Sequence, residues 1–213
     1  MKTSPEIFRL YAVSDRSWLK AGETLVGVTE LLLQNGVTCL QLREKYLSDK
    51  DFYEEAREMK VLCERYQIPL IINDRVDIAK AIGADGVHVG LSDMGIRKAR
   101  GYLGDDFIIG GSAHNVAEAL AAEAAGADYI GCGAVFGSST KSDASILPLD
   151  ELRKICVSVK IPVVAIGGIT TGNLPFLAGS GIAGPAVVSA LYGVLDSAQA
   201  ARQLRELWEK LQS

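Results

Sequence analysis

Short apolar runs rich in β-branched residues alternate along the chain with longer segments in which apolar residues recur at helical spacing. The runs predict strands over residues 8–14, 39–45, 69–74, 86–90, 107–113, 129–136, 163–168 and 185–190. The helical pattern predicts helices over 24–35, 49–66, 77–82, 94–103, 115–125, 149–157, 173–179 and 197–211. This alternation is typical of a parallel sheet, because each helix returns the chain to the start of the next strand.

The number of strand–helix units matches a (β/α)8 barrel, the TIM barrel, and 213 residues is near the lower size limit of that fold. A doubly wound open sheet is the alternative. No linker rich in Ser, Gly or Pro interrupts the pattern, so residues 1–213 are expected to form a single α/β domain. The longest polar interruption, residues 137–148, is typical of a binding loop.

Composition narrows the class of protein. With 48% hydrophobic but only 7% aromatic residues, the core is expected to be aliphatic, and a net charge of -4 argues against nucleic acid as a partner. The sequence shows no signal-peptide pattern and no apolar run long enough for a bilayer, so we expect a cytoplasmic protein without a membrane partner. Self-association into a homo-oligomer stays open. Cys39, Cys63, Cys132 and Cys156 lack CxxC spacing, which predicts buried reduced thiols.

Polar residues gather where the predicted strands end, which is where barrels place their active sites. In the second strand Gln41, Arg43 and Lys45 stand at alternate positions and therefore share one face. A guanidinium group and an ammonium group both suit phosphate oxygens, so this face predicts an anionic ligand. The alternative is a structural ion-pair network that also includes Asp74.

Two carboxylates follow neighbouring predicted strands. Asp74 ends the third strand and Asp93 follows the fourth, and such a pair suits Mg²⁺, which takes one or two carboxylates together with ligand phosphates. Asp93 could instead cap the next helix. Gly167, Gly168 and Ser189 follow the seventh and eighth strands, where barrels frequently bind phosphate, although the glycines could serve close packing alone.

The chain lacks the motifs of covalent or nucleotide-driven catalysis. There is no G-x-S-x-G elbow, no Walker loop, and no GxGxxG after a strand. His88 lies inside an apolar strand and is expected to be a hydrogen-bonded core residue, while His114 could cap a helix or take part in chemistry. Two anion sites and a metal suggest the joining of two phosphorylated small molecules, with diphosphate as the leaving group.

Six motifs, in this order, resemble the thiamine phosphate synthase family: "QLREK", "INDRVDIAKAIGADGVHVGLSD", "GGSAHN", "AGADYIGCGAVFGSSTKSD", "VVAIGGI" and "AVVSA". The resemblance covers about residues 8–192. It implies a TIM barrel transferase that joins hydroxymethylpyrimidine diphosphate to thiazole phosphate and uses Mg²⁺. It also implies a dissociative reaction, which needs neutralisation of the leaving group and alignment of two substrates rather than a nucleophile.

The resemblance also implies roles for individual residues. Gln41 and Ser112 would face the pyrimidine, while Arg43, Lys45 and Asn73 would hold the diphosphate. The remaining roles are Mg²⁺ ligands for Asp74 and Asp93, a catalytic bridge to the diphosphate for Lys141, and contacts to the thiazole phosphate for Ser138, Thr140, Gly168, Val188 and Ser189. Arg43, Lys45 and Lys141 are thus the expected catalytic cations.

The chain departs from the family pattern at three places: Leu91 in place of Gln, "GSSTK" with Gly137 in place of a proline, and Pro185 at the start of the last strand. These departures keep two alternatives in view. One is an isomerase similar to thiazole tautomerase, which would need a proton shuttle such as His114 but no diphosphate site. The other is a barrel that binds thiazole or thiamine phosphate without catalysis. Retention of Arg43, Lys45 and the aspartates favours the synthase.

Overall fold

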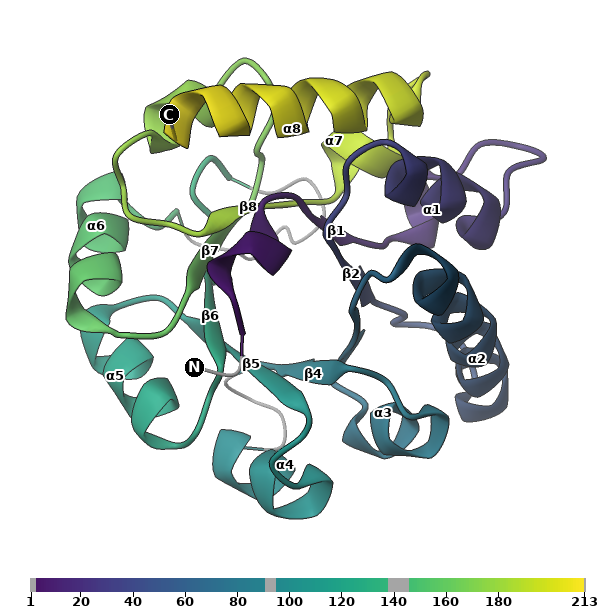
Figure 1. The fold of residues 1–213 in the computed structure, drawn as a ribbon, viewed down its shortest axis with the longest axis horizontal. Coiled ribbons are helices and arrows are strands. Elements are labelled where there is room, and N and C mark those ends of the chain that lie inside the picture. Colours follow the sequence, from purple (N-terminus) through teal and green to yellow (C-terminus); the bar gives the residue numbers. More distant parts are fainter. Residues whose placement is uncertain (1–2, 91–94, 138–145, 213) are drawn as a thin grey trace.

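The structure is a computed structural model that describes residues 3–90, 95–137 and 146–212. Within these residues, parallel strands close into a barrel in chain order, and the last strand pairs with the first (Figure 1). The strands are β1 (Tyr11–Val13), β2 (Cys39–Leu42), β3 (Leu70–Asn73), β4 (Gly86–Val89), β5 (Ile108–Ala113), β6 (Tyr129–Gly133), β7 (Val163–Ile166) and β8 (Gly184–Val187). The predicted (β/α)8 barrel is therefore confirmed.

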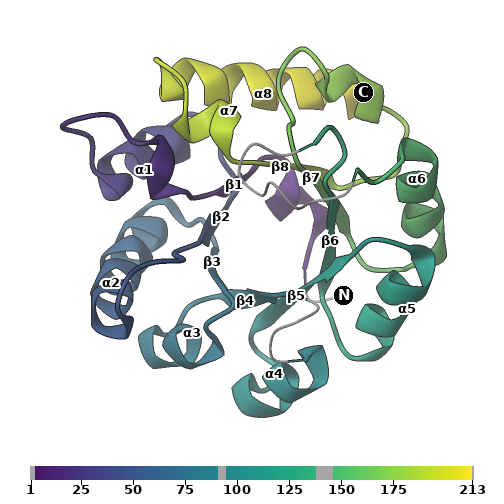
Figure 2. The same cartoon turned by 180° about the vertical axis from the view of Figure 1, so that it is seen from behind.

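Helices surround the ring of strands, as both face-on views show (Figures 1 and 2). The α-helices are α1 (Leu25–Gln34), α2 (Asp49–Tyr66), α3 (Val76–Ile82), α4 (Ile96–Leu103), α5 (Val116–Ala124), α6 (Leu149–Ser158), α7 (Ser189–Tyr192) and α8 (Ser197–Gln212). Three 3-10 helices complete the described segments: η1 (Pro5–Phe8), η2 (Arg16–Trp18) and η3 (Leu174–Leu177). No helix in these segments is long and apolar enough to cross a membrane.

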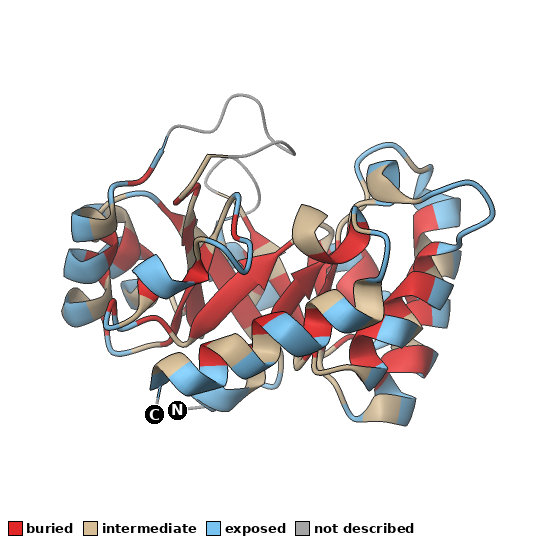
Figure 3. Cartoon of the chain, turned by 90° about the horizontal axis from the view of Figure 1, so that it is seen from above, coloured by how far each residue is buried: buried red, intermediate tan, exposed pale blue. Residues whose placement is uncertain are grey.

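The core has two layers. Apolar faces of the helices pack on the outside of the barrel, and Trp208 of α8, which is 1% exposed, belongs to this layer (Figure 3). A smaller cluster fills the inside of the barrel: Phe8, Tyr11, Val13, Cys39, Ile71, Tyr129, Val164 and Ala186. Phe8 enters it from η1, which precedes β1 and contacts β8. The barrel is thus a packed core whose chemistry is restricted to the ends of its strands.

Helix ends follow local chemistry that the sequence shows. The side chain of Asn115 accepts a hydrogen bond from the backbone N–H of Glu118 and so caps the start of α5. Ser48 caps α2 in the same way by accepting from Asp51. Gly126, with φ of 99°, follows the end of α5, as predicted for a glycine after a helix.

Several predicted elements differ from those observed. The first strand is shorter than residues 8–14, because Phe8 belongs to η1. The strand predicted over 129–136 ends at Gly133. The segment 173–179 forms only the 3-10 helix η3. This helix has a proline in its first turn and no side-chain cap. Ser189 starts α7 rather than ending β8. Apart from η3, these differences lie at element boundaries, where a hydrophobic pattern cannot separate a strand from an adjoining helical turn.

The cysteines match the prediction of unpaired, mostly buried thiols. Cys39, Cys63 and Cys132 are buried and Cys156 is partly exposed. Burial raises the pKa of both Cys63 and Cys132 to about 12. Because the thiolate is the reactive form, these side chains serve as small apolar groups in the core.

Candidate active site

The cations after β2 stand just beyond the strand. The ladder between β2 and β3 ends where Leu42 pairs with Ile72, so Arg43 and Lys45 belong to the following loop. The prediction that Gln41, Arg43 and Lys45 lie in one strand is therefore wrong for both cations. The backbone N–H of Arg43 nevertheless donates to Ser14 Oγ at 2.9 Å, which ties the start of the loop to the end of β1.

Both cations are paired with acids from neighbouring loops. Arg43 Nη1 donates to Asp15 Oδ2 at 3.3 Å, and the two side chains are 15% and 14% exposed. Lys45 Nζ donates to Asp74 Oδ2 at 3.0 Å. The pair of Lys45 with Asp74 belongs to the ion-pair network that the sequence offered as the alternative, whereas Asp15 as the partner of Arg43 was not predicted. The arrangement brings Lys45 and Asp74 together, as both the anion-site and the ion-pair interpretations require.

Asp74 has an unusual backbone for a residue with a side chain. Its φ is 63°, in the left-handed region that only a few residue types, aspartate among them, enter with ease. Its backbone N–H donates to the carbonyl of His88 at 2.9 Å, and its Oδ2 accepts from Asn73 Nδ2 at 2.6 Å. These bonds fix the carboxylate between the ends of β3 and β4, where it stands 24% exposed.

This carboxylate has the chemistry of a magnesium ligand. Among the described residues no group of three or more His, Cys, Asp or Glu side chains could form a complete metal cage. Mg²⁺ does not need one, since it keeps several waters and takes one or two carboxylates together with substrate phosphates. Asp74 fits this pattern, while Asp93, the second predicted ligand, lies outside the described residues.

A chain of hydrogen bonds crosses the inside of the barrel below this end. Gln41 Nε2 donates to Tyr11 Oη at 2.8 Å, and Tyr11 Oη lies 2.8 Å from Tyr129 Oη. His88 Nδ1 is 2.9 Å from Tyr129 Oη, and His88 Nε2 is 3.1 Å from Ser112 Oγ. His88 is thus the hydrogen-bonded core histidine that the sequence predicted. The network connects Gln41 with Ser112, the two residues expected to face the pyrimidine.

Burial fixes the protonation of this network. It raises the pKa of Tyr11 and of Tyr129 well above the usual value, so both hydroxyls keep their protons. Gln41 donates to Tyr11. Every proton in the hydrogen-bond network then has an acceptor when Tyr11 donates to Tyr129 and Tyr129 donates to His88 Nδ1. His88 then carries its proton on Nε2 and donates to Ser112 Oγ. This order orients the Ser112 hydroxyl at the end of β5.

His114 lies directly before Asn115, the cap of α5, and contacts Glu118 in the first turn of that helix. Its backbone N–H donates to Glu118 Oε2 at 2.7 Å, and its ring Nδ1 lies 3.2 Å from the same oxygen. The interaction lowers the pKa of Glu118, although partial burial opposes the shift. The cap of α5 is therefore Asn115 rather than His114, and His114 is held beside the first turn by its contacts with Glu118.

The loop after β7 comes close to the segment after β6. Gly167 and Gly168 have φ of 105° and 65°, and a Cβ on Gly168 would stand 2.8 Å from the carbonyl oxygen of Phe136. The close packing foreseen for this pair is therefore real, and it does not exclude a phosphate contact. Val188 directly follows β8 at the N-cap position of α7, and Ser189 is the first residue of that helix.

Several predicted site residues lie outside the described residues. They are Asp93, Ser138, Thr140 and Lys141, together with Leu91 among the departures from the family pattern. The described residues resume at 146, before α6. Leu147 contacts the barrel there, since its backbone N–H donates to the carbonyl oxygen of Ala134 at 2.8 Å.

Three residues of the site have no counterpart in the sequence-based prediction. Tyr11 and Tyr129 were counted as strand residues, and Asp15 as part of a connection. The available signal for Tyr11 was its place in a strand, because a tyrosine buried in a barrel needs a partner for its hydroxyl group. For Asp15 no sequence signal connects it with Arg43, 28 residues away.

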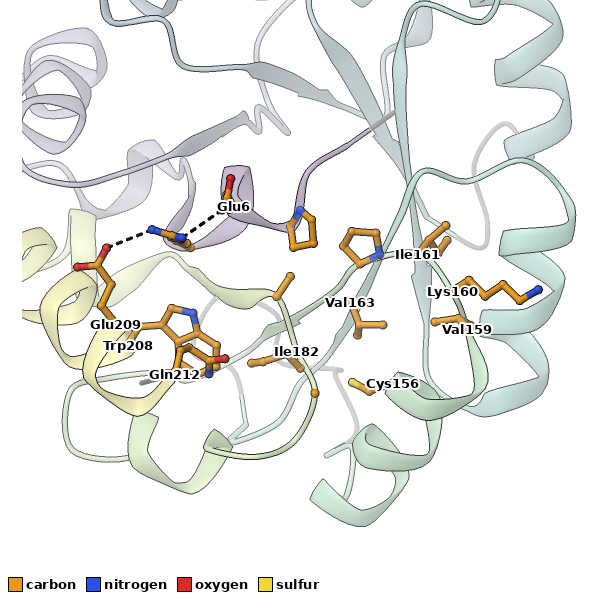
Figure 4. A pocket seen from close by; sticks show the side chains of 15 residues that line it. Glu6, Cys156, Val159, Lys160, Ile161, Val163, Ile182, Trp208, Glu209 and Gln212 are labelled. Carbon is orange, nitrogen blue, oxygen red and sulfur yellow. Dashed lines mark hydrogen bonds and ion pairs between the residues drawn. The ribbon is translucent and has the colours of Figure 1, made fainter. Parts of the chain in front are cut away.

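A cavity of about 680 Å³ lies at the opposite end of the barrel. Figure 4 shows its lining, which includes Glu6, Val163, Ile182 and Trp208 from segments at the N-terminal ends of the strands and from α8. The predicted site residues lie at the other end, and none of them lines this cavity. In barrels of this type the N-terminal end contributes to stability, so the cavity is not the substrate site.

A closed barrel with cations, amides and a carboxylate at the C-terminal ends of its strands is the arrangement of a (β/α)8-barrel enzyme that acts on anionic substrates. A family model described as thiamine monophosphate synthase matches residues 10–191. The chain belongs to this family.

Individual relatives agree over nearly the whole length. The chain is 48% identical over 203 residues to a thiamine-phosphate synthase of Clostridium acetobutylicum, covering 95% of this chain and 96% of that one. It is 50% identical over 182 residues to a thiamine-phosphate synthase of Methanobrevibacter smithii, covering 85% and 86%. A thiamine phosphate pyrophosphorylase structure from Pyrococcus furiosus superposes with a TM-score of 0.90 at 38% identity, covering 98% and 99%.

Proposed function

We propose that the chain is a thiamine-phosphate synthase that joins hydroxymethylpyrimidine diphosphate to thiazole phosphate and releases diphosphate. The observation that carries the proposal is its 48% identity to a thiamine-phosphate synthase over 95% of the chain. The geometry at the C-terminal end of the barrel agrees with it. Arg43, Lys45 and Asp74 occupy adjacent loops there, and buried polar contacts support Gln41 and Ser112.

The diphosphate would lie over the loops after β2 and β3. Arg43 and Lys45 each pair with one carboxylate in the structure. The pair of Lys45 with Asp74 is partly exposed, and pairs of this kind are weak enough to rearrange when a phosphate arrives. Asn73 stands at the end of β3 and could donate to a phosphate oxygen once it turns from Asp74. Lys141, from the segment after β6, would complete the cationic environment.

Asp74 and Asp93 would hold Mg²⁺ together with the diphosphate oxygens and water. When bound, the ion neutralises negative charge that develops on the departing diphosphate. The ion pair between Asp74 and Lys45 suits this role, because binding of a cation to the carboxylate would release Lys45 toward the phosphate.

The two organic parts would bind on either side of this charge. Gln41 and Ser112 would contact the pyrimidine, with the buried tyrosines and His88 holding both side chains in place. The phosphate of the thiazole would bind across the segments after β6, β7 and β8. Its expected contacts are Ser138, Thr140, Gly168, Val188 and Ser189.

The reaction would be dissociative. The bond between the pyrimidine's methylene carbon and the diphosphate oxygen breaks, and the diphosphate leaves with the electron pair. The thiazole nitrogen then supplies its lone pair to the resulting cation, forming the new C–N bond. Arg43, Lys45 and Lys141 stabilise the leaving group, and the walls of the site hold the two reactants in line. No covalent enzyme intermediate is required.

The direct test is to incubate the protein with both substrates and Mg²⁺ and to follow thiamine phosphate. A correctly folded protein that forms none at any Mg²⁺ concentration would overturn the proposal. Two alternatives would then remain, the isomerase and the barrel that binds without catalysis. An assay for conversion of a thiazole carboxylate tautomer would distinguish them, because only the isomerase would convert it.

A second test addresses the metal site. Asp93→Ala is expected to abolish Mg²⁺-dependent turnover while leaving the affinity for thiazole phosphate, measured by calorimetry, largely unchanged. Turnover that survives the substitution would mean that Asp93 caps the helix that follows it rather than binding the metal.

A further inference from the structure

Three charged side chains meet beside the loop that carries Arg43 and Lys45. Arg16 of η2 donates from Nε to Glu44 Oε2 at 2.8 Å and from Nη2 to Glu55 Oε1 at 2.7 Å. Glu44 lies between the two site cations in the sequence, and Glu55 belongs to α2. The Glu44 side chain is only 2% exposed and that of Glu55 18%, so both carboxyl groups are largely removed from water.

Each carboxyl group has one oxygen that Arg16 leaves unused. Glu44 Oε1 and Glu55 Oε2 are buried and have no hydrogen-bond partner among the described residues. Two such acceptors are costly to bury, and two carboxylates cannot bond each other. A single proton between them solves both problems, since one oxygen becomes a donor to the other.

The electrostatics agree with this geometry. The pKa of Glu55 is raised to about 7, first by burial and then by the charge and hydrogen bond of Glu44, while Arg16 opposes the rise. These are the charged groups that affect Glu55 from the neighbouring elements: Arg16 from η2 and Glu44 from the loop after β2. With one shared proton, the three side chains together carry no net charge.

We propose that Glu44 and Glu55 share one proton and that this pair, held by Arg16, positions the loop carrying Arg43 and Lys45 for the diphosphate. The inference rests on the proposed function for its effect on substrate. Glu44 joins Arg43 to Lys45 in the chain, so the bonds that hold its side chain to Arg16 and beside Glu55 restrain the loop between the two cations. Glu44 and Glu55 are positioning residues, because they do not contact the substrate.

The pair also couples the loop to pH. Glu55 in an unfolded chain titrates near 4.5, well below its folded pKa of about 7. The folded protein therefore holds the extra proton between these values, and the stability that the pair contributes is lost as pH rises through about 7. Above that pH two buried negative charges face each other beside Arg43 and Lys45.

Glu55→Gln tests the shared proton without reference to activity. Glutamine keeps the shape, stays uncharged, and offers an N–H to Glu44 Oε1 at every pH. The carboxyl carbon resonance of Glu55 in the wild type is expected to titrate near pH 7, and the melting temperature of Glu55→Gln relative to wild type is expected to rise between about pH 5 and pH 8. A resonance that titrates near its ordinary value and a constant difference in melting temperature would overturn the inference.

The positioning role is tested by kinetics against pH. For the pyrimidine diphosphate, we compare the ratio of KM at about pH 8.5 to KM at about pH 6. This ratio is expected to be roughly three- to tenfold larger in the wild type than in Glu55→Gln, with a smaller change in kcat. Glu44→Gln should behave like Glu55→Gln. Glu58→Gln, which removes an exposed carboxylate from the same helix, should follow the wild type. Identical profiles for wild type and Glu55→Gln would overturn the positioning role.

The outcomes separate this inference from the proposed function. If no thiamine phosphate forms at any pH, the proposed function fails, while the resonance and melting experiments still decide whether the proton is shared. If turnover is normal and the Glu55 resonance titrates near its ordinary value, the proposed function stands and the inference is wrong.

Discussion

At the scale of single residues, Asp74 shows how function can break a local rule. A residue with a side chain and a φ of 63° is strained in most settings, and it persists here because Asn73, Lys45 and the backbone of β4 hold it. Aspartate is one of the few residue types that adopt this conformation readily, so these contacts, rather than stored strain, hold the carboxylate at the proposed site.

Asp74→Asn separates the charge of this residue from its conformation. Asparagine also tolerates the left-handed backbone, so stability should change little, whereas loss of the carboxylate should lower kcat/KM by about 100-fold or more and raise the Mg²⁺ requirement. Steady-state kinetics at several Mg²⁺ concentrations and a thermal melt measure both effects. Asp77→Asn in α3 is the control, and equal losses in the two variants would contradict the metal role.

Lys45→Ala tests whether the partner of Lys45 is the substrate or only Asp74. We expect the affinity for the pyrimidine diphosphate to fall much more than the affinity for thiazole phosphate, because Lys45 lies at the diphosphate end of the proposed site. Calorimetric titration with each substrate gives the comparison. A similar loss for both substrates would assign Lys45 a structural role in its pair with Asp74.

At the scale of elements, the sequence predicted α2 with its observed bounds and placed α5 to within a residue at each end, because caps and apolar spacing mark both helices. It could not predict where β2 stops. The alternation from Gln41 to Lys45 continues past Leu42, while the ladder ends there for lack of partners on β1 and β3. Pairs such as Arg43 with Asp15 depend on two loops meeting in space, and no local pattern encodes that meeting.

The loop after β7 offers a test of close approach between elements. Gly168 and Gly83 have nearly equal φ, 65° and 64°, but a Cβ on Gly168 would meet the backbone at Phe136 and Gly137, whereas a Cβ on Gly83 would meet nothing within 4 Å. Gly83→Ala should therefore lose only the conformational preference, about 1–2 kcal/mol.

Gly168→Ala should lose more stability by at least about 1 kcal/mol, because the segment after β6 must move. Since the segment after β6 leads to Lys141, the KM of Gly168→Ala for thiazole phosphate should also rise. Denaturant unfolding and steady-state kinetics of both variants measure this. Equal stability loss in the two variants would mean that the segment after β6 yields without strain.

At the scale of the whole molecule, the barrel divides stability from chemistry. Its C-terminal end carries Arg43, Lys45 and Asp74, while η1, the large cavity and the end of α8 lie at the N-terminal end. The sequence indicated the first end through polar residues after strands. It gave no sign of the cavity, because most of the cavity's lining is apolar and looks like core.

The cysteines allow this division to be tested in one experiment. Cys156 lines the cavity and is the one partly exposed thiol of the four, whereas Cys39, Cys63 and Cys132 are buried. In native protein near pH 8 an alkylating reagent should therefore modify Cys156 first and slowly, since burial raises its pKa to about 11. Because Cys156 lies at the end opposite the proposed site, the singly modified enzyme should keep its KM for both substrates. Mass spectrometry identifies the modified residue, and Cys156→Ser should remove the first phase. Earlier modification of Cys132 would contradict the order of exposure, and loss of turnover on modification of Cys156 would show that the two ends of the barrel are coupled.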